Sequence, residues 1–193
     1  MIIKNFQLEN NINIIEKYKC LLLYGENDGQ KKDIIETVKK KYENSQFHIF
    51  FQNEVIKDSQ VLFEEVNNVS LFSSSKIILI REANDKIFDI LREILNKELN
   101  NIKLIITSNI LEKKSKLRNY FEKENNLAIC PCYEDTDFNL KTYLKNKLIS
   151  LPQIQGSMID LIIKNSNNNR QIIQNEINKI LCYQHNKKFP IRK

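Results

Sequence analysis

The turn at residues 25–32, GENDGQKK, is the part of this chain that comes nearest to a phosphate-binding site. A phosphate-binding loop has the spacing GxxxxGK followed by Ser or Thr, so that backbone amides surround the phosphates and the hydroxyl binds magnesium. Here Gly25 and Gly29 have the wrong spacing, and Lys31 is followed by another lysine instead of a hydroxyl residue. Two acidic side chains in the same turn would face an incoming polyphosphate. We therefore predict that Gly25, Gly29 and Lys31 form a degenerate phosphate loop that does not support ATP hydrolysis.

The acidic residues that should accompany such a loop are missing as well. In ATP-hydrolysing proteins of this type, a buried strand ends in an acidic pair that holds the metal ion and polarises water. The apolar run at residues 76–80, KIILI, ends instead in Arg81 and Glu82. A lone Glu after a strand is usually a solvated loop residue. Two independent departures thus argue against nucleotide hydrolysis.

Other residue types that carry catalysis are present without the arrangement that catalysis needs. His48 lies in an apolar run and is far along the chain from the second histidine. The serines at 73–75 lack the context of a nucleophile elbow. Ser115 and Lys116 are adjacent on an expected helix and so diverge by about 100°, which makes Ser115 a helix N-cap and not half of a dyad. We predict no catalytic residue.

The four cysteines do not form a metal or disulfide framework. Cys130 and Cys132 have one residue between them, whereas zinc knuckles use two to four, and only two histidines are present. Reduced and mostly buried thiols are the expected state of Cys20, Cys130, Cys132 and Cys182. The sequence indicates no metal site and no cofactor.

Two large apolar residues, Leu71 and Phe72, follow Ser70 in a turn that is otherwise Asn and Ser. Such a turn has no local need for them, and large apolar groups near solvent gain little unless something covers them. One interpretation is that they fold back onto the protein's own core, since isolated apolar surface residues are common. The other is that they bind a partner.

Five short apolar runs predict strands at 20–25, 46–51, 76–80, 103–107 and 127–130, and the first, CLLLYG, fits a strand that is buried on both faces. Amphipathic helices separate them, with Asp28, Asp58 or Ser59, and Asp85 as expected capping residues. This alternation predicts an α/β fold with a five-stranded parallel sheet and helices on both faces.

After Pro131 the pattern contains only helical periods. The expected buried stripes are Leu140, Tyr143, Leu144 and Leu148; Met158, Leu161 and Ile162; and Ile172, Ile173, Ile177, Ile180 and Leu181. We therefore expect one domain at 1–134 and a small all-helical domain at 135–193.

Bulk composition narrows the class of protein. Hydrophobic content of 41% and charged content of 28% are typical of a globular protein, and no apolar run approaches the length needed to cross a bilayer. We expect no membrane association and a cytoplasmic location. The net charge of +6 is weak evidence for DNA binding, because the basic residues are mostly scattered Lys instead of clustered Arg.

Taken together, the chain resembles the delta subunit of bacterial DNA polymerase III, the clamp-loader subunit that opens the sliding clamp. The matching segments are 21–29, 70–83, 104–123 and 175–183, and the second, SLFSSSKIILIREA, is the specific one. The resemblance implies an AAA+ fold whose nucleotide site does not work, followed by a lid-like helical domain. It also implies that Ser70, Leu71 and Phe72 bind a hydrophobic pocket of the clamp.

Further expectations follow from the same resemblance. The chain would be a non-catalytic subunit of a DNA-directed DNA polymerase, a nucleotidyltransferase complex active in DNA replication. Its partners would be the sliding clamp (the beta ring), other clamp-loader subunits, and primed DNA only within the assembled loader. Family members continue into a collar domain, which this chain would lack because it stops near 189–193. Two alternatives remain at this stage, an AAA+-type nucleotide-binding enzyme and a weak basic nucleic-acid-binding module.

Overall fold

The computed structural model describes residues 1–68, 75–151, 154 and 156–185. The chain forms two compact units. The first consists of residues 1–26 and 31–133, and the second of residues 27–30 and 134–193. The first therefore holds the sheet, whereas the second holds the carboxyl-terminal helices together with the short turn at 27–30.

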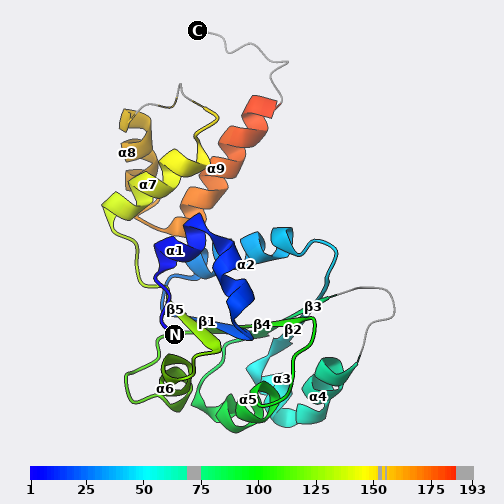
Figure 1. Ribbon diagram of the computed structural model, residues 1–193. Coiled ribbons are helices and arrows are strands. Elements are labelled where there is room, and N and C mark those ends of the chain that lie inside the picture. The colour runs from blue at the N-terminus through cyan, green and yellow to red at the C-terminus, as the bar shows by residue number, and fades with distance from the viewer. Residues whose placement is uncertain (69–74, 152–153, 155, 186–193) are drawn as a thin grey trace. The chain divides into compact units, whose positions relative to one another are not determined.

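A five-stranded parallel sheet forms the centre of the first unit (Figure 1). Its strand order is β2-β3-β4-β1-β5, and every neighbouring pair is parallel. The strands are β1 (Cys20–Tyr24), β2 (Gln46–Phe51), β3 (Lys76–Arg81), β4 (Ile102–Ser108) and β5 (Leu127–Pro131). All five agree with the apolar runs of the sequence, so the predicted α/β fold class is confirmed.

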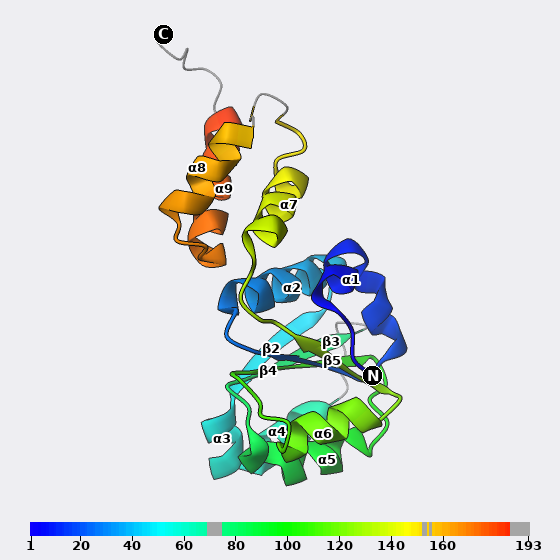
Figure 2. The ribbon, with the colours of Figure 1, turned by 90° about the vertical axis from the view of Figure 1, so that its left-hand side faces the viewer.

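Helices cover both faces of this sheet (Figure 2). One face carries α1 (Asn5–Asn10), the 3₁₀ helix η1 (Ile12–Lys17) and α2 (Asp28–Lys41). The other carries α3 (Gln52–Lys57), α4 (Ser59–Asn67), the 3₁₀ helix η2 (Asp85–Ile87), α5 (Phe88–Leu95) and α6 (Lys116–Lys123). The sequence did not indicate α1, η1 or α3.

The two faces have separate cores because side chains alternate along each strand. Leu22, Ile78 and Ile106 pack with the helices α3 to α6. Leu21 and Ile105, one residue away, pack with α1 and α2 instead. A strand buried on both faces is apolar at every position, which is why β1, buried throughout, was visible in the sequence as a continuous apolar run, whereas β2 is only partly buried.

The chain's first residues lie along the outer edge of β5. Ile2 bridges Ile129 in parallel, the Ile3 amide donates to the Ile129 carbonyl at 2.8 Å, and the Ile129 amide donates to the Met1 carbonyl at 3.0 Å. Residues 1–3 therefore satisfy the outward main-chain groups of Ile129 at this edge of the sheet.

At two helices the structure shows a capping residue that differs from the one predicted from the sequence. α2 begins at Asp28, and its cap is the preceding residue, Asn27, whose Oδ1 accepts from the Gln30 amide at 3.0 Å. Asp85 does not cap the helix that follows it, since Asn84 accepts from the Lys86 amide there. Its carboxylate caps α6 instead, as described below.

The second unit contains α7 (Asp137–Lys147), α8 (Gly156–Asn165) and α9 (Arg170–His185). Their common core is formed by Leu140, Tyr143, Leu144, Leu148, Leu151, Ile159, Ile163, Ile173 and Ile177. The stripe predicted for α8 was wrong at two of its three positions: Met158 and Leu161 are about half exposed, whereas Ile162 packs against the core, beside the buried Ile159 and Ile163. The described helices include none that is long and apolar enough to cross a membrane.

Candidate functional site

Gly25 follows β1 at the position expected for the first glycine of the degenerate loop. Its φ is +129°, and a Cβ built on it would lie 2.2 Å from the carbonyl oxygen of Cys132. The close approach is fixed by the Cys132 amide, which donates to the Tyr24 carbonyl at 2.7 Å. Glycine is thus required here for main-chain packing beside β5, independently of any phosphate.

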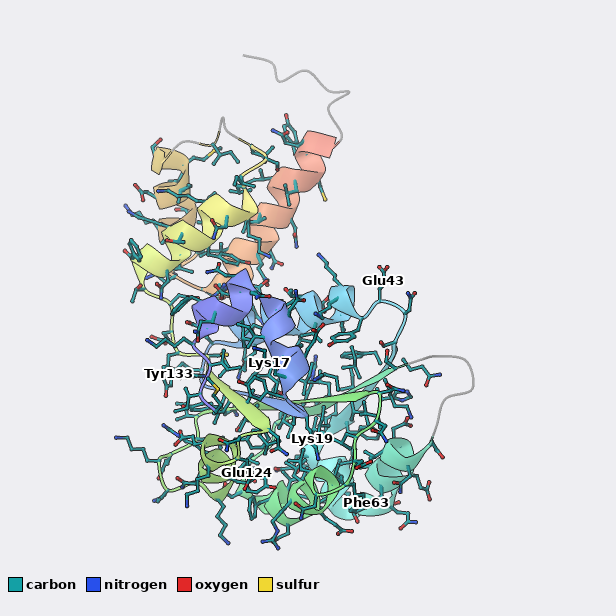
Figure 3. All side chains as sticks on the ribbon, in the orientation of Figure 1. Lys17, Lys19, Glu43, Phe63, Glu124 and Tyr133 are labelled. Atoms are coloured by element: carbon teal, nitrogen blue, oxygen red, sulfur yellow. The ribbon has the colours of Figure 1, made fainter. Side chains whose placement is uncertain are left out.

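Tyr24 and Tyr133 add a side-chain contact at the same end of the sheet. Their hydroxyls are 3.1 Å apart, and their rings meet edge to face with centroids 6.0 Å apart. Tyr133 is labelled in Figure 3. Burial is the main cause that raises the pKa of Tyr24, and the hydrogen bond to Tyr133 adds to it. The guanidinium of Arg118 lies 5.1 Å from the Tyr24 ring centroid. These contacts fill space beyond the carboxyl end of β1 with protein side chains.

Lys31 is buried, with 5% of its surface exposed. Its ammonium donates to the carbonyl oxygens of Gly25, at 2.8 Å, and Ser108, at 3.0 Å. Both carbonyls stand at the carboxyl ends of central strands, because Gly25 follows β1 and Ser108 ends β4. The lysine that would reach phosphates in a working loop therefore links the ends of two strands.

The turn at 27–30 forms side-chain hydrogen bonds within the second, helical unit. Asn27 donates through Nδ2 to Asp135 Oδ2 at 2.8 Å, and Asp135 accepts from Nη1 of Arg170 at 3.2 Å. The side chains of Arg170 and Asp135 are only 2% and 3% exposed. The Arg170 guanidinium also lies 4.1 Å from the ring centroid of Tyr143. This buried network was not expected from the sequence.

Gly29 packs against the same network. A Cβ on Gly29 would lie 2.8 Å from the Cβ of Arg170 and 3.0 Å from the Gln171 amide nitrogen. The second glycine of the turn is thus needed for close packing against the first residues of α9. One signal in the sequence could have indicated the pair: Arg170 is the first residue of a helix, where a cation opposes the helix dipole and needs an acidic partner.

Asp85 and Ser115 together cap α6. Ser115 Oγ donates to Asp85 Oδ1 at 2.6 Å, and the amides of Lys116 and Leu117 donate to the same carboxylate at 3.1 and 3.0 Å. Ser115 also accepts from the Arg118 amide, so its predicted capping role is confirmed. Burial opposes ionisation of Asp85, but these hydrogen bonds outweigh it and lower the pKa of the carboxyl.

The remaining sequence candidates do not come together into a reactive cluster. His48 Nδ1 lies 3.5 Å from Glu65 Oε2. Cys20, Cys130 and Cys132 are buried and form no disulfide, as predicted, while Cys182 is exposed. Within the described ranges, no group of three or more His, Cys, Asp or Glu side chains could hold a metal ion.

The predicted partner-binding residues Ser70, Leu71 and Phe72 lie outside the described residues. The chain on either side is well anchored. Lys76, the first residue of β3, is 5% exposed and donates to the carbonyls of Glu65 at 2.8 Å and Asn68 at 3.0 Å, and it also pairs with the Glu65 carboxylate. A cation on the last carbonyls of α4 complements the helix dipole. Residues 69–74 therefore connect two fixed points.

Comparison with known proteins finds a bacterial replication protein that is similar to this chain. The chain is 24% identical over 170 residues to the probable DNA polymerase III subunit delta of Rickettsia prowazekii, a match that covers 88% of this chain. This chain is similar in sequence to a DNA polymerase III delta subunit. The resemblance inferred from the sequence is thereby confirmed.

The fold agrees with that relationship. The Bacillus subtilis DNA clamp loader delta protein (YqeN) has a TM-score of 0.66 against this chain, with 10% sequence identity over 95% of the chain. No protein-family model matches. The chain spans 52% of the Rickettsia delta subunit and 59% of the Bacillus one, or somewhat more than half of each.

Proposed function

We propose that this chain is a clamp-loader subunit of the replicative DNA polymerase, which binds the sliding clamp and helps to open it for loading onto primed DNA. The observation that carries the proposal is the relationship to the delta subunits, with the same fold over 95% of the chain. Ser70, Leu71 and Phe72 are the proposed contact with the clamp, and the other loader subunits are its proposed partners.

The proposed mechanism is mechanical. Interface energy is concentrated in a few apolar anchors, each of which contributes about 2 kcal/mol or more when it fills a pocket. Binding of Leu71 and Phe72 would stabilise an opened interface of the ring, and ATP-driven changes in neighbouring subunits would expose or hide these residues. The fixed ends of the segment at Asn68 and Lys76 support this proposal, because anchored flanks lower the entropy cost of presenting two side chains.

We propose further that the chain is not an enzyme by itself. Three observations on the degenerate loop support this. Lys31 is used by two main-chain carbonyls, Asn27 already caps the first turn of α2, and the glycines Gly25 and Gly29 serve close packing. A helix N-terminus that is capped by its own side chain has fewer free amides to offer a phosphate.

Clamp binding is the experiment that tests the proposal. The 193-residue chain would be passed over the immobilised cognate clamp beside a Leu71→Ala/Phe72→Ala variant. Two anchors of about 2 kcal/mol each predict a loss of about a thousandfold in affinity. The thermal midpoint should stay unchanged, since a lower midpoint would mean that the two residues pack in this protein's own core.

A matched control comes from two exposed apolar residues elsewhere, Ile110 and Phe138, which are 67% and 77% exposed. The Ile110→Ala/Phe138→Ala variant removes the same types of side chain and should bind as the wild type does. An equal loss in both double variants, or no binding by the wild type, would contradict the proposed site. Titration with Mg²⁺ and ATP should give no heat, and a saturable signal there would favour the nucleotide-binding alternative.

A further inference from the structure

The two edges of the sheet differ in how they are covered. At one edge, β5 is bonded along its outer side by residues 1–3. At the other edge, β2 pairs with β3, and no second strand flanks it among the described residues. An open edge strand presents a row of main-chain donors and acceptors that can pair with another chain.

The direction of these main-chain groups is set by the ladder to β3. The Gln46 amide donates to the Ser75 carbonyl at 3.3 Å, so residues of even number direct their main-chain groups toward β3. Phe47, Ile49 and Phe51 therefore direct theirs outward. The Phe51 amide donates to Glu54 Oε2 at 2.9 Å, and the Phe51 carbonyl, at the N-cap of α3, accepts the first hydrogen bond of that helix. The amides and carbonyls of Phe47 and Ile49 therefore remain for a partner strand.

The side chains at this edge are apolar and partly exposed. Ile49 is 44% exposed and Phe51 is 39% exposed, and Phe47 is half-buried against the core beneath α2. Large apolar side chains on an open edge are unusual, because proteins normally protect such edges with charge, proline or a covering segment. The arrangement favours burial by a further strand.

We propose that β2 pairs antiparallel with β2 of a second copy of this chain, about a two-fold axis at Ile49. The strand FHIFF, residues 47–51, reads almost the same in both directions, so this register places Ile49 opposite Ile49 and Phe47 opposite Phe51. Cross-strand apolar and aromatic pairs of this kind stabilise antiparallel strands. Two main-chain hydrogen bonds form between the Ile49 residues, and two more, from Phe51 amides to Phe47 carbonyls, form when the partner's carbonyl replaces Glu54 Oε2 on the Phe51 amide.

Charges at the two ends of the strand complement each other in this register. At the amino end, the ammonium of Lys39 lies 4.2 Å from the centroid of the Phe47 ring. At the carboxyl end, the Glu54 carboxylate holds the Phe51 amide. Because Phe47 of one copy faces Phe51 of the other, Lys39 and Glu54 come together twice across the two-fold axis. Parallel pairing would place like charges together instead.

The interface is small, so the association should be weak. One pair of six-residue strands buries less than the roughly 1,200–2,000 Å² of standard stable complexes. We expect a monomer at low micromolar concentration and a dimer that forms as the concentration approaches millimolar. Sedimentation equilibrium of the 193-residue chain over that range measures this directly.

Replacing Ile49 with residues of opposite charge tests the proposed register of the two β2 strands. Ile49→Lys and Ile49→Glu each place like charges opposite one another at the axis, so each variant alone should dimerise at least about tenfold more weakly. An equimolar mixture of the two should recover dimers, because Lys then faces Glu. Ile49→Pro removes an outward amide without touching the ladder to β3 and should also weaken the dimer. Ile110→Lys, at an exposed site elsewhere, should change nothing.

Several outcomes would overturn the proposal. A wild-type chain that stays monomeric to millimolar concentration has no such interface. Dimers that persist unchanged in Ile49→Lys are formed by another surface. Two monomeric variants that do not associate when mixed show that Ile49 does not lie on the axis. Circular dichroism melting of each variant ensures that loss of dimers is not loss of fold.

Discussion

Removal of one partner from the buried Asp135–Arg170 pair should strongly destabilise the helical unit. Both side chains are 97% or more buried, and Nη1 of Arg170 lies 3.2 Å from each carboxylate oxygen. Breaking a buried ion pair typically costs about 3–5 kcal/mol, because the remaining charge is left without compensation. Asp135→Asn keeps the shape and one acceptor oxygen, so we expect the lower end, about 3 kcal/mol.

Replacing both partners should cost much less than the sum of the two single changes. In Asp135→Leu/Arg170→Met no charge remains buried, and apolar side chains of similar volume often replace an ion pair with little loss. The Asn27 amide then lacks its acceptor, which should leave a residual cost of about 1 kcal/mol. The signature is therefore a large and favourable coupling between the two positions.

Hydrogen exchange, measured by mass spectrometry on the intact chain, shows how much stability the helical unit loses in the single variants and in which helices. A loss of about 3 kcal/mol should accelerate exchange in α7 and α9 by about a hundredfold, since each 1.4 kcal/mol is a factor of ten. Peptides from β1 and β4 serve as the internal reference and should be unchanged. Single variants that cost less than about 1 kcal/mol, or effects that simply add, would refute the reasoning.

Three further predictions concern the sheet unit. Asp85→Asn should lower the free energy of unfolding by about 1 kcal/mol at neutral pH through loss of the charged cap of α6. The pKa of Asp85 is lowered on folding, so its stabilisation is fully present above the unfolded pKa of about 4 and declines as pH falls towards the folded value. In urea melts, the difference between wild type and variant should therefore be smaller at pH 3 than at pH 7. Gly25→Ala should destabilise by at least about 1–3 kcal/mol in the same melts, since its Cβ would clash with the Cys132 carbonyl, and a neutral result would mean that the main chain moves freely there. Lys76→Met removes the cation that caps α4, so exchange of the last α4 amides should accelerate while Lys114→Met, at an exposed pair, should have no effect.

The buried strands were predictable because each is an uninterrupted run of apolar residues in the sequence. A parallel strand between two helical layers has no solvent face, so runs such as IILI, residues 77–80, are apolar at every position. α2 and α5 were also predictable, since each has a wide apolar stripe that packs on one face of the sheet. Fold class therefore follows from local patterns, and the observed sheet agrees with it.

Features that depend on distant partners were not predictable. Asp85 reads as a cap for the next helix, yet its carboxylate binds the start of α6, about 30 residues later. The stripe on α8 was assigned in part to the wrong face because Met158 and Ile159 are both apolar, and only packing against α7 and α9 separates them. The Asp135–Arg170 pair joins positions 35 residues apart, and charge signs alone do not choose between many possible partners.

The order of strands in space has a consequence for how this protein is made. β1 is synthesised first, but its neighbours in the sheet are β4 and β5, so Leu22 pairs with Ile106 and Ile129. A ribosome adds about 5–20 residues each second, so the most apolar strand of the chain waits several seconds for both of its neighbours. During that interval the exposed apolar side chains and unpaired main chain of β1 can bind chaperones or start aggregation. Slowed translation between residues 25 and 102 should therefore lower the soluble yield, whereas slowing after residue 131 should not.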